Sequence, residues 1–243
     1  MTPEVLLASF DAGKVALSFF VSVVGAFAAL TAAAHIGGGA HGKVSWLNAG
    51  VAGLALGGVG IWSMHFLGML AYDVPLAIGY RWLELIVSLV AAVVVSGVAL
   101  GYMASAAFSW RRLLIAGPLA GIGVTVMHYL GVVGMSFGGY FDWSFALVAA
   151  SVLIAIVAAT AALWLAFHVR TLPHRAAASL VMGTAVCAMH YTGMAAASLV
   201  CTTTERNSFL PGVLRPADLG LLVTVVAISV ACRSGRRVSA RWR

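Results

Sequence analysis

Long apolar runs alternate with short polar breaks along the whole chain. Seven runs are long enough to cross a bilayer, whose hydrocarbon core of about 30 Å needs roughly 20 helical residues. They cover approximately residues 14–35, 46–71, 83–108, 113–137, 143–168, 176–200 and 217–232. Glycine, alanine and serine are frequent in all of them, and such small residues allow membrane helices to pack closely. The pattern predicts an all-α, polytopic membrane protein with seven transmembrane helices in one bundle.

Composition supports this class and excludes a soluble domain. The chain is 62% hydrophobic and 9% charged, with a mean hydropathy of +1.03, whereas soluble domains have about 25% charged residues. The sequence pI of 9.8 could suggest a nucleic-acid partner. However, the basic residues lie in short breaks between apolar runs, where they orient a protein in a membrane. The lipid bilayer is therefore the expected partner, and no nucleic acid is.

The two sides of the predicted bundle differ in charge. The first, third, fifth and seventh breaks hold ten Lys and Arg residues and no acid, and the other side holds four basic residues together with all seven acids. The positive-inside rule then places the N-terminus outside and the C-terminus in the cytoplasm.

One motif, Met-His-aromatic-x-Gly, occurs three times within the apolar runs, at residues 64–68, 127–131 and 189–193. The histidines are separated by 63 and 62 residues, so each repeat contains two helices. We expect three tandem units, about 14–71, 83–137 and 143–200, related by an axis along the membrane normal. Residues 1–200 then form one membrane domain. Residues 201–243 contribute a periplasmic loop, the seventh helix and a short basic cytoplasmic tail.

The three motif histidines should meet. All three motif helices run from the cytoplasm outward, and each histidine lies roughly 5 to 10 residues before the outer end, about 7–15 Å below the surface. His65, His128 and His190 are therefore expected to converge on one site in the outer half of the bundle.

Metal binding is the function that this pattern favours. A single buried histidine can be a satisfied core residue, but an ionisable group in a membrane is costly, and three occur here in matched frames. Imidazole binds copper, zinc, iron or nickel, and thioether sulfur favours Cu(I). The methionines either add soft ligands or fill the core. The candidate metal ligands are His65, His128, His190, Met64, Met69, Met127, Met189 and Met194.

The remaining motif positions suggest supporting roles. Tyr129 and Tyr191 could donate hydrogen bonds to ligands from just outside a metal site, and they are the candidate cofactor-binding residues. Phe66 holds the same slot without a hydroxyl. The motif glycines most simply allow close contact between helices.

The residues by themselves leave several functions open. A metal-dependent sensor competes with a copper-handling or redox electron-carrier protein, and with a membrane scaffold that binds no ligand. Copper is the expected cofactor. Haem is the weaker alternative, because three equal repeats do not supply paired histidines naturally. No nucleophile–base pair, phosphate loop or carboxylate dyad is visible, so an enzyme is not expected.

The wording of the motifs resembles that of the MHYT family of bacterial integral-membrane sensor domains. GIWSMHF, from Gly60 to Phe66, and AMHYTGMAA, from Ala188 to Ala196, carry the resemblance, which covers about residues 16–200. It implies conserved Met, His and Tyr near the outer face of the bacterial inner membrane, proposed to hold copper and to sense O2, CO or NO.

Phe66 and Leu130 depart from the family wording. Many members of the family carry an output domain after the seventh helix, whereas this chain ends at Arg243. The resemblance therefore leads us to expect a stand-alone module that signals through a separate cytoplasmic or membrane protein.

Overall fold

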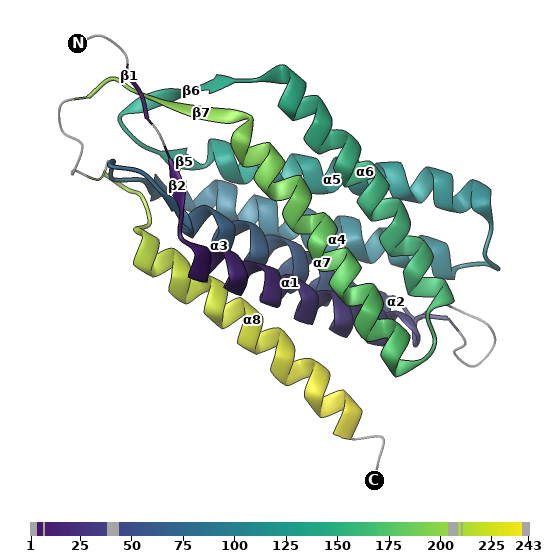
Figure 1. Ribbon diagram of the computed structural model, residues 1–243. Coiled ribbons are helices and arrows are strands. Elements are labelled where there is room, and N and C mark those ends of the chain that lie inside the picture. The colour runs from purple at the N-terminus through teal and green to yellow at the C-terminus, as the bar shows by residue number, and fades with distance from the viewer. Residues whose placement is uncertain (1–3, 7, 38–43, 204–208, 210, 240–243) are drawn as a thin grey trace.

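The computed structural model describes residues 4–6, 8–37, 44–203, 209 and 211–239, and helices account for most of them (Figure 1). The second long helix is continuous through α2 (Trp46–Gly53), the π-helical η2 (Leu54–Ser63) and α3 (Met64–Leu70). The other long helices are α1 (Ala12–Ala33), α4 (Trp82–Ala104), α5 (Trp110–Val133), α6 (Phe145–His168), α7 (Leu172–Ala195) and α8 (Pro216–Ser239). The predicted helical bundle with seven long helices is confirmed in this part of the chain.

Five of the described helices are long and apolar enough to cross a membrane: α1, the second helix over Trp46–Leu70, α4, α5 and α6. The apolar stretch of α8 is shorter, Pro216–Ser229, and α7 carries two histidines, an arginine, a tyrosine and several small polar residues. Both helices nevertheless run within or against the same bundle. The chain is therefore a multi-pass membrane protein.

The last helix is longer than its apolar run. It continues to Ser239, past the predicted end near residue 232. Basic residues are favourable at a helix C-terminus, which explains why the helix does not stop where hydrophobicity does. The basic tail predicted for residues 233–243 is otherwise outside the description, since the side chains from residue 230 onward are not described.

Short strands cover one end of the bundle, and the sequence pattern missed them. Three strands pair in the order β1 (Glu4–Val5), β7 (Ala197–Cys201) and β6 (Gly139–Trp143). Two further pairs are β2 (Ser9–Phe10) with β3 (Tyr72–Asp73) and β4 (Gly79–Tyr80) with β5 (Met135–Ser136). The fifth and seventh strands belong to apolar runs that were predicted to be helical to residues 137 and 200. An apolar run alone does not distinguish a strand from a buried helix, and here antiparallel pairing decides.

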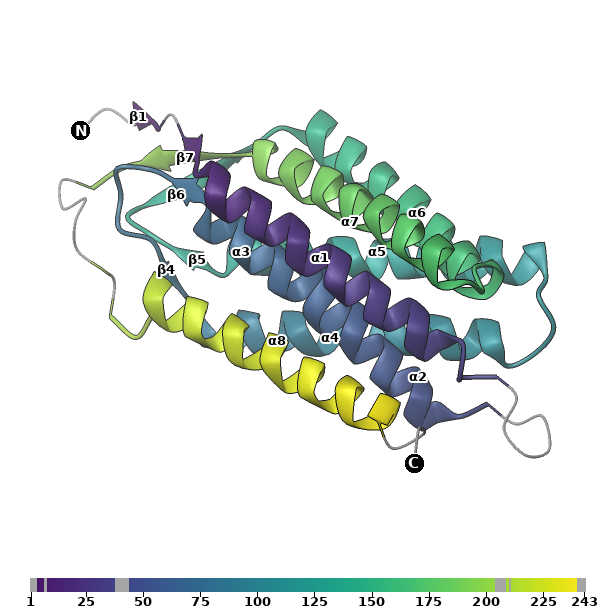
Figure 2. The ribbon, with the colours of Figure 1, turned by 60° about the horizontal axis from the view of Figure 1, so that its bottom comes forward.

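Six helices alternate around the bundle. The three motif-bearing helices are the second helix, α5 and α7. Between them lie α4, which contacts the second helix and α5; α6, which contacts α5 and α7; and α1, which contacts α7 and the second helix. Each of the three predicted two-helix units contributes one motif-bearing helix and one intervening helix to this ring. The last helix, α8, lies outside it against η2 and α3, along the edge of the bundle in Figure 2.

Glycine permits the closest of these contacts. A Cβ added at Gly25 of α1 would collide with the backbone of Gly60 in η2, and one added at Gly53 would lie 2.7 Å from the Cα of Gly97 in α4. Ser22 also donates a hydrogen bond of 2.8 Å to the Gly60 carbonyl across the first contact. Such backbone proximity holds the second helix tightly between its neighbours.

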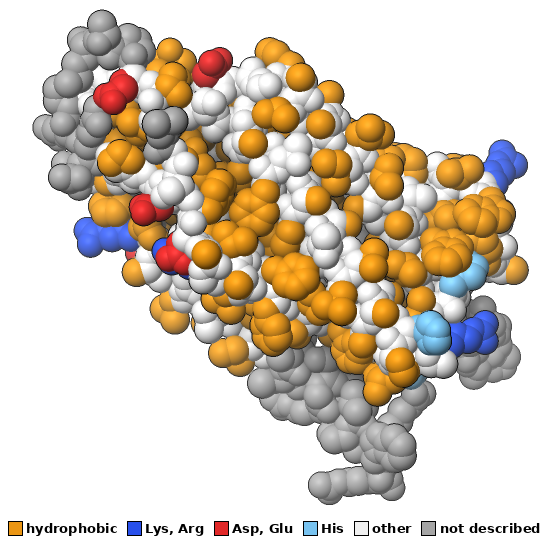
Figure 3. Space-filling view, viewed as in Figure 1, with side chains coloured by type: hydrophobic (Ala, Val, Ile, Leu, Met, Phe, Trp, Pro, Cys, Tyr) orange, Lys and Arg blue, Asp and Glu red, His pale blue; other side chains and the backbone are white. Residues whose placement is uncertain are grey.

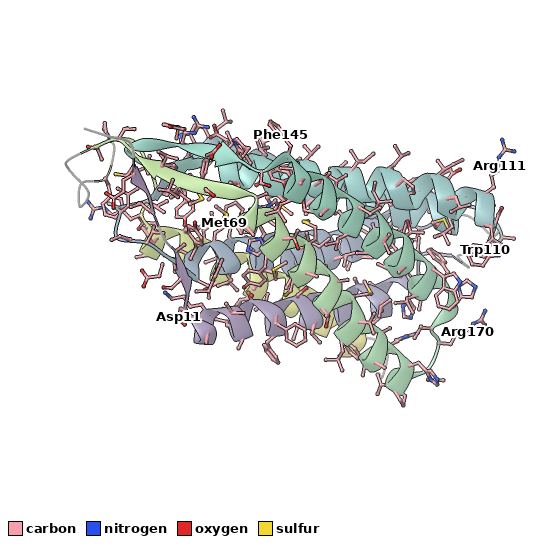
Figure 4. The ribbon with its side chains drawn as sticks, turned by 45° about the horizontal axis from the view of Figure 1, so that its top comes forward. Asp11, Met69, Trp110, Arg111, Phe145 and Arg170 are labelled. Atoms are coloured by element: carbon pink, nitrogen blue, oxygen red, sulfur yellow. The ribbon has the colours of Figure 1, made fainter. Side chains whose placement is uncertain are left out.

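The two ends of the bundle carry different charges. We call the end with β1–β7 the strand end and the end with Arg111, Arg112, Arg170 and Arg175 the arginine end. Figure 4 shows Asp11 and Phe145 at the strand end and Trp110, Arg111 and Arg170 at the other. The acidic side chains visible in Figure 3 also lie at the strand end. Lys43, Glu205 and Arg206, which the charge argument also used, are outside the described residues.

The orientation across the membrane remains a prediction that cysteine labelling can test. In a background with the three native cysteines replaced by serine, Asp142→Cys at the strand end should react with an impermeant maleimide on intact cells. Arg111→Cys at the arginine end should react only after permeabilisation, because positive charge is retained on the cytoplasmic side. The reverse labelling pattern would place the strand end in the cytoplasm.

Candidate functional site

Three imidazoles meet inside the bundle near the strand end. His65 Nδ1 lies 3.0 Å from His190 Nδ1 and 3.1 Å from His128 Nδ1. Candidate ligand nitrogens of the three rings all lie within 4.8 Å of one another. At most 1% of any of these residues is exposed. The predicted convergence is confirmed.

Matched helix ends place the rings at one level. His65 lies in α3, His128 in α5 and His190 in α7, and in each helix the last residue is the fifth after the histidine. Because each helix rises about 1.5 Å per residue, equal distance from the helix end gives equal depth below the strands. A distance of five residues from the helix end is the smaller of the two limits predicted from the sequence, and it corresponds to about 7 Å.

The motif glycines make room for the histidines of neighbouring units. A Cβ at Gly68 would collide with His190 Nε2, one at Gly131 with His65 Nε2, and one at Gly193 with His128 Nε2. Close helix contact, the role predicted for these glycines, is therefore only part of the explanation. Each glycine forms the seat for an imidazole from another helix, and the three contacts close a ring around the site.

Contact with the motif glycines holds the Nε2 atoms of the three histidines in place. The Nε2 atoms of all three histidines are buried without a hydrogen-bond partner among the described residues. Most ligating histidines donate from their second nitrogen to a carboxylate or carbonyl. Here the glycine seats set the ring positions instead, and the Nδ1 atoms face the centre.

The triad has the dimensions of a three-nitrogen metal site. With metal–nitrogen bonds of about 2.0–2.1 Å, three ligands around one ion lie about 3.3–3.6 Å apart. The two closest Nδ1 pairs, at 3.0 and 3.1 Å, would need only small shifts. Within the described residues the cluster contains no carboxylate, and no acid is buried. These donors suit copper or zinc better than magnesium or calcium.

All five candidate methionines are buried, which both metal ligation and core packing require. Met64, Met69, Met127, Met189 and Met194 are at most 2% exposed, and Figure 4 shows Met69 inside the bundle. Four of them belong to the main apolar core, so packing alone accounts for their burial. Met194 also lines a pocket of about 240 Å³ at the strand end. Their role as ligands remains a prediction.

The motif tyrosines bind serines rather than histidines. The Tyr129 hydroxyl lies 2.7 Å from Ser151 Oγ in α6, and the Tyr191 hydroxyl lies 3.0 Å from Ser18 Oγ in α1. The hydrogen bonds to the histidines that we expected are replaced by these contacts. Both tyrosines still touch the site, because their rings stand edge-on to those of His128 and His190 with centroids 4.8 Å apart.

The first unit replaces the missing hydroxyl with an indole. Phe66 has no hydroxyl, and Trp62, one turn earlier, donates from Nε1 to Ser88 Oγ of α4 at 3.0 Å. Each serine in turn donates to the carbonyl three residues before it. A polar contact between a motif helix and the next helix around the bundle is thus present in all three units.

Aromatic residues at the strand end complete the same pattern. Phe66 contacts Tyr80, Tyr129 contacts Trp143, and Tyr191 contacts Phe10, with ring centroids 6.5, 5.6 and 5.4 Å apart. Burial of Tyr80 raises the pKa of its phenol, which keeps this group neutral.

Neither the serines nor these strand-end aromatic residues were predicted from the sequence. A signal was available, because an aromatic residue precedes a serine by eight positions in every unit: Phe10 and Ser18, Tyr80 and Ser88, Trp143 and Ser151.

Comparison with known proteins places this site within a family repeat. The family model described as MHYT, bacterial signalling protein N-terminal repeat, matches the chain three times, at residues 58–116, 121–179 and 183–242. Each match starts shortly before a motif histidine and includes the following helix. The third match therefore includes α8, although in the structure α1 takes the place between α7 and the second helix.

Several signalling proteins are similar to this chain. The bifunctional diguanylate cyclase/cyclic di-GMP phosphodiesterase MucR of Pseudomonas aeruginosa is 37% identical over 93% of this chain and 33% of its own length. The cyclic di-GMP phosphodiesterase NbdA of the same organism is 34% identical over 77% of this chain and 24% of its own. The signaling protein YkoW of Bacillus subtilis is 32% identical, over 63% and 20%. The chain thus spans a third or less of these relatives, and no solved structure matches it.

Substitution of a motif glycine tests the imidazole seats. Gly131→Ala should lower the free energy of unfolding in detergent by about 1–3 kcal/mol, as overpacking of a core does, because its Cβ would collide with His65. Gly50→Ala is the matched control, since a Cβ there meets nothing within 4 Å; it should leave stability unchanged or raise it by about 0.5–1 kcal/mol. Equal stability of the two variants would show that the seat has room to spare.

A double-mutant cycle tests the serine contacts. Tyr129→Phe and Ser151→Ala should show a coupling energy of about 0.6 kcal/mol, the mean for hydrogen bonds between membrane helices. Tyr129→Phe combined with Ser18→Ala should show none, because Ser18 bonds to Tyr191 instead. Unfolding of each variant in mixed detergent supplies the energies, and similar coupling in both cycles would contradict the assignment.

Proposed function

Because the chain belongs to the MHYT family of bacterial signalling proteins, we propose that it is a membrane sensor module whose three histidines bind copper. The observation that supports this proposal is the convergence of three buried Nδ1 atoms, two pairs of them at 3.0 and 3.1 Å, with no buried acid among the described residues. His65, His128 and His190 are the main ligands, and Met69 and Met194 are soft auxiliary ones.

The charge balance of the core favours copper in its singly charged state. A charged group within the membrane is costly, and each additional charge adds to that cost. A doubly charged ion has more charge to offset, and no acid is buried among the described residues to offset it. Cu(I) needs less compensation and prefers the imidazole and thioether donors that are present.

A change at the metal would reach the whole bundle. When bound, copper supplies a position that a diatomic gas such as O2, CO or NO can occupy, or a redox state that can change. Each imidazole belongs to one motif helix and is seated on a glycine of another. A shift of any ring therefore presses directly on a neighbouring helix, and packed interfaces respond by moving as units.

The output would be read at the arginine end. Two of the relatives are cyclic di-GMP enzymes by name, so a cyclic di-GMP enzyme is the partner we propose. Arg111, Arg112, Arg170 and Arg175 lie at the end that we predict to be cytoplasmic. The role proposed for this chain is sensing, and catalysis belongs to the partner.

Copper handling is the second candidate function. The strand-end pocket favours it, because Met194, four residues after His190, lines that pocket and could receive a soft ion from outside. A handling protein must release its copper readily, whereas a sensor must keep it. Retention after mild chelation therefore separates the two candidates.

Metal analysis of purified protein tests the proposal. Wild-type protein should keep about one copper per chain after mild chelation, as expected for one three-histidine site. His128→Ala should lose most of it, because changes outside the ligand shell already cost about 10–100-fold in affinity. His174→Ala, which removes an exposed histidine at the arginine end, should retain wild-type copper. Equal copper in both variants, or none in the wild type, would contradict the copper site.

A further inference from the structure

An apolar cavity lies inside the bundle, deeper than the histidines. Its volume is about 60 Å³, and all six alternating helices contribute to its lining. Its wall is dominated by alanine and other apolar side chains, and Ser96 has the only polar side chain among the described residues that line it.

The cavity adjoins the histidine site in every unit. Ile61, Val124 and Val186, which line it, each lie four residues before a motif histidine. Residues four apart lie on the same helix face, one turn from each other. Met189, directly before His190, is also part of the wall. The cavity therefore begins about one helical turn below the imidazoles, on the side away from the strands.

Water is a poor occupant of this space. A buried water typically makes about three hydrogen bonds, and an apolar cavity remains dry even when it is large enough for several waters. Ser96 offers a single hydroxyl, and the carbonyls of the surrounding helices are engaged in their own hydrogen bonds.

Its size selects among apolar occupants. A cavity of about 150 Å³ accepts benzene or xenon, and one of about 10–15 Å³ holds a single water-sized molecule. At about 60 Å³, this cavity is too small for an aromatic ring, a lipid chain or a haem. It has room for molecules of two atoms.

We infer that this cavity is a binding site for a small apolar gas molecule such as O2, and that it is filled whether or not the histidines hold a metal. Its role as a reservoir beside the sensor site rests on the proposed function, but gas binding itself does not. A gas molecule held there would lie about one helical turn from the histidines, on the side away from the strands and aromatic residues.

Paramagnetic relaxation by dissolved O2 tests this inference on metal-free protein. Chelated protein with ¹³C-labelled methionine methyl groups, in nanodiscs of deuterated lipid, is measured under O2 and under N2. The methyl groups of Met182 and Met189 line the cavity and should relax several-fold faster under O2. Met103 and Met135 are similarly buried but do not line it, and they should respond much less.

A cavity-filling variant separates gas in the cavity from gas in the bilayer. Ala159→Leu places a larger side chain in the wall and should abolish the additional relaxation at Met182 and Met189. Ala161→Leu, on the exposed face of the same helix and outside the wall, should leave it intact. If Ala159→Leu does not fold, Ala99→Val makes a smaller change in the same wall.

The outcomes distinguish this inference from the copper proposal. The O2 response should persist in His128→Ala, which lacks the proposed metal site. An equal response of all four methyl groups, or one that filling the cavity leaves unchanged, would overturn the gas site even if copper binds. A positive response in a protein that never binds copper would support the cavity and contradict the sensor proposal alone.

Discussion

The burial of three imidazoles in an apolar membrane bundle is the constraint on which the rest of the structure depends. Ionisable groups at membrane depth are costly unless they have partners, and in the described part of the chain no acid joins the cluster of His65, His128 and His190. Their partners on the inner side are one another, at 3.0 and 3.1 Å between Nδ1 atoms. Such close mutual approach is possible only if three helices bring their rings to one level and one axis.

Several contacts enforce that geometry, and each occurs three times. A glycine seats each ring, a serine on the neighbouring helix binds each motif helix, and a strand-end aromatic residue covers each motif aromatic residue. Trp62 shows that the contact matters more than the residue type, since its indole replaces the hydroxyl that Phe66 lacks. Because every ring is coupled to two helices, the histidine site and the helix packing cannot change independently.

The site has two different environments above and below it. Towards the strands, paired β-segments and aromatic rings cover the histidines. Towards the arginine end, the described wall residues are apolar apart from Ser96 and leave a small cavity. Polar ions and apolar gases would therefore approach the same three imidazoles from opposite sides, which suits a site whose proposed task is to combine a metal with a dissolved gas.

The sequence by itself determined the membrane class, the number of long helices and the level of the histidines. The length of a hydrophobic run and the spacing of a rare polar residue can be read from the chain alone. Neither depends on which segments pack against each other in the folded protein. Only the tertiary structure decided that Gly131 seats His65, that Ser18 binds Tyr191, and that residues 197–201 form a strand rather than the end of a helix. It also decided that α8 packs against η2 and α3. These features depend on which helix faces which neighbour, and that choice follows from packing between segments far apart in the chain, about which a local pattern carries no information.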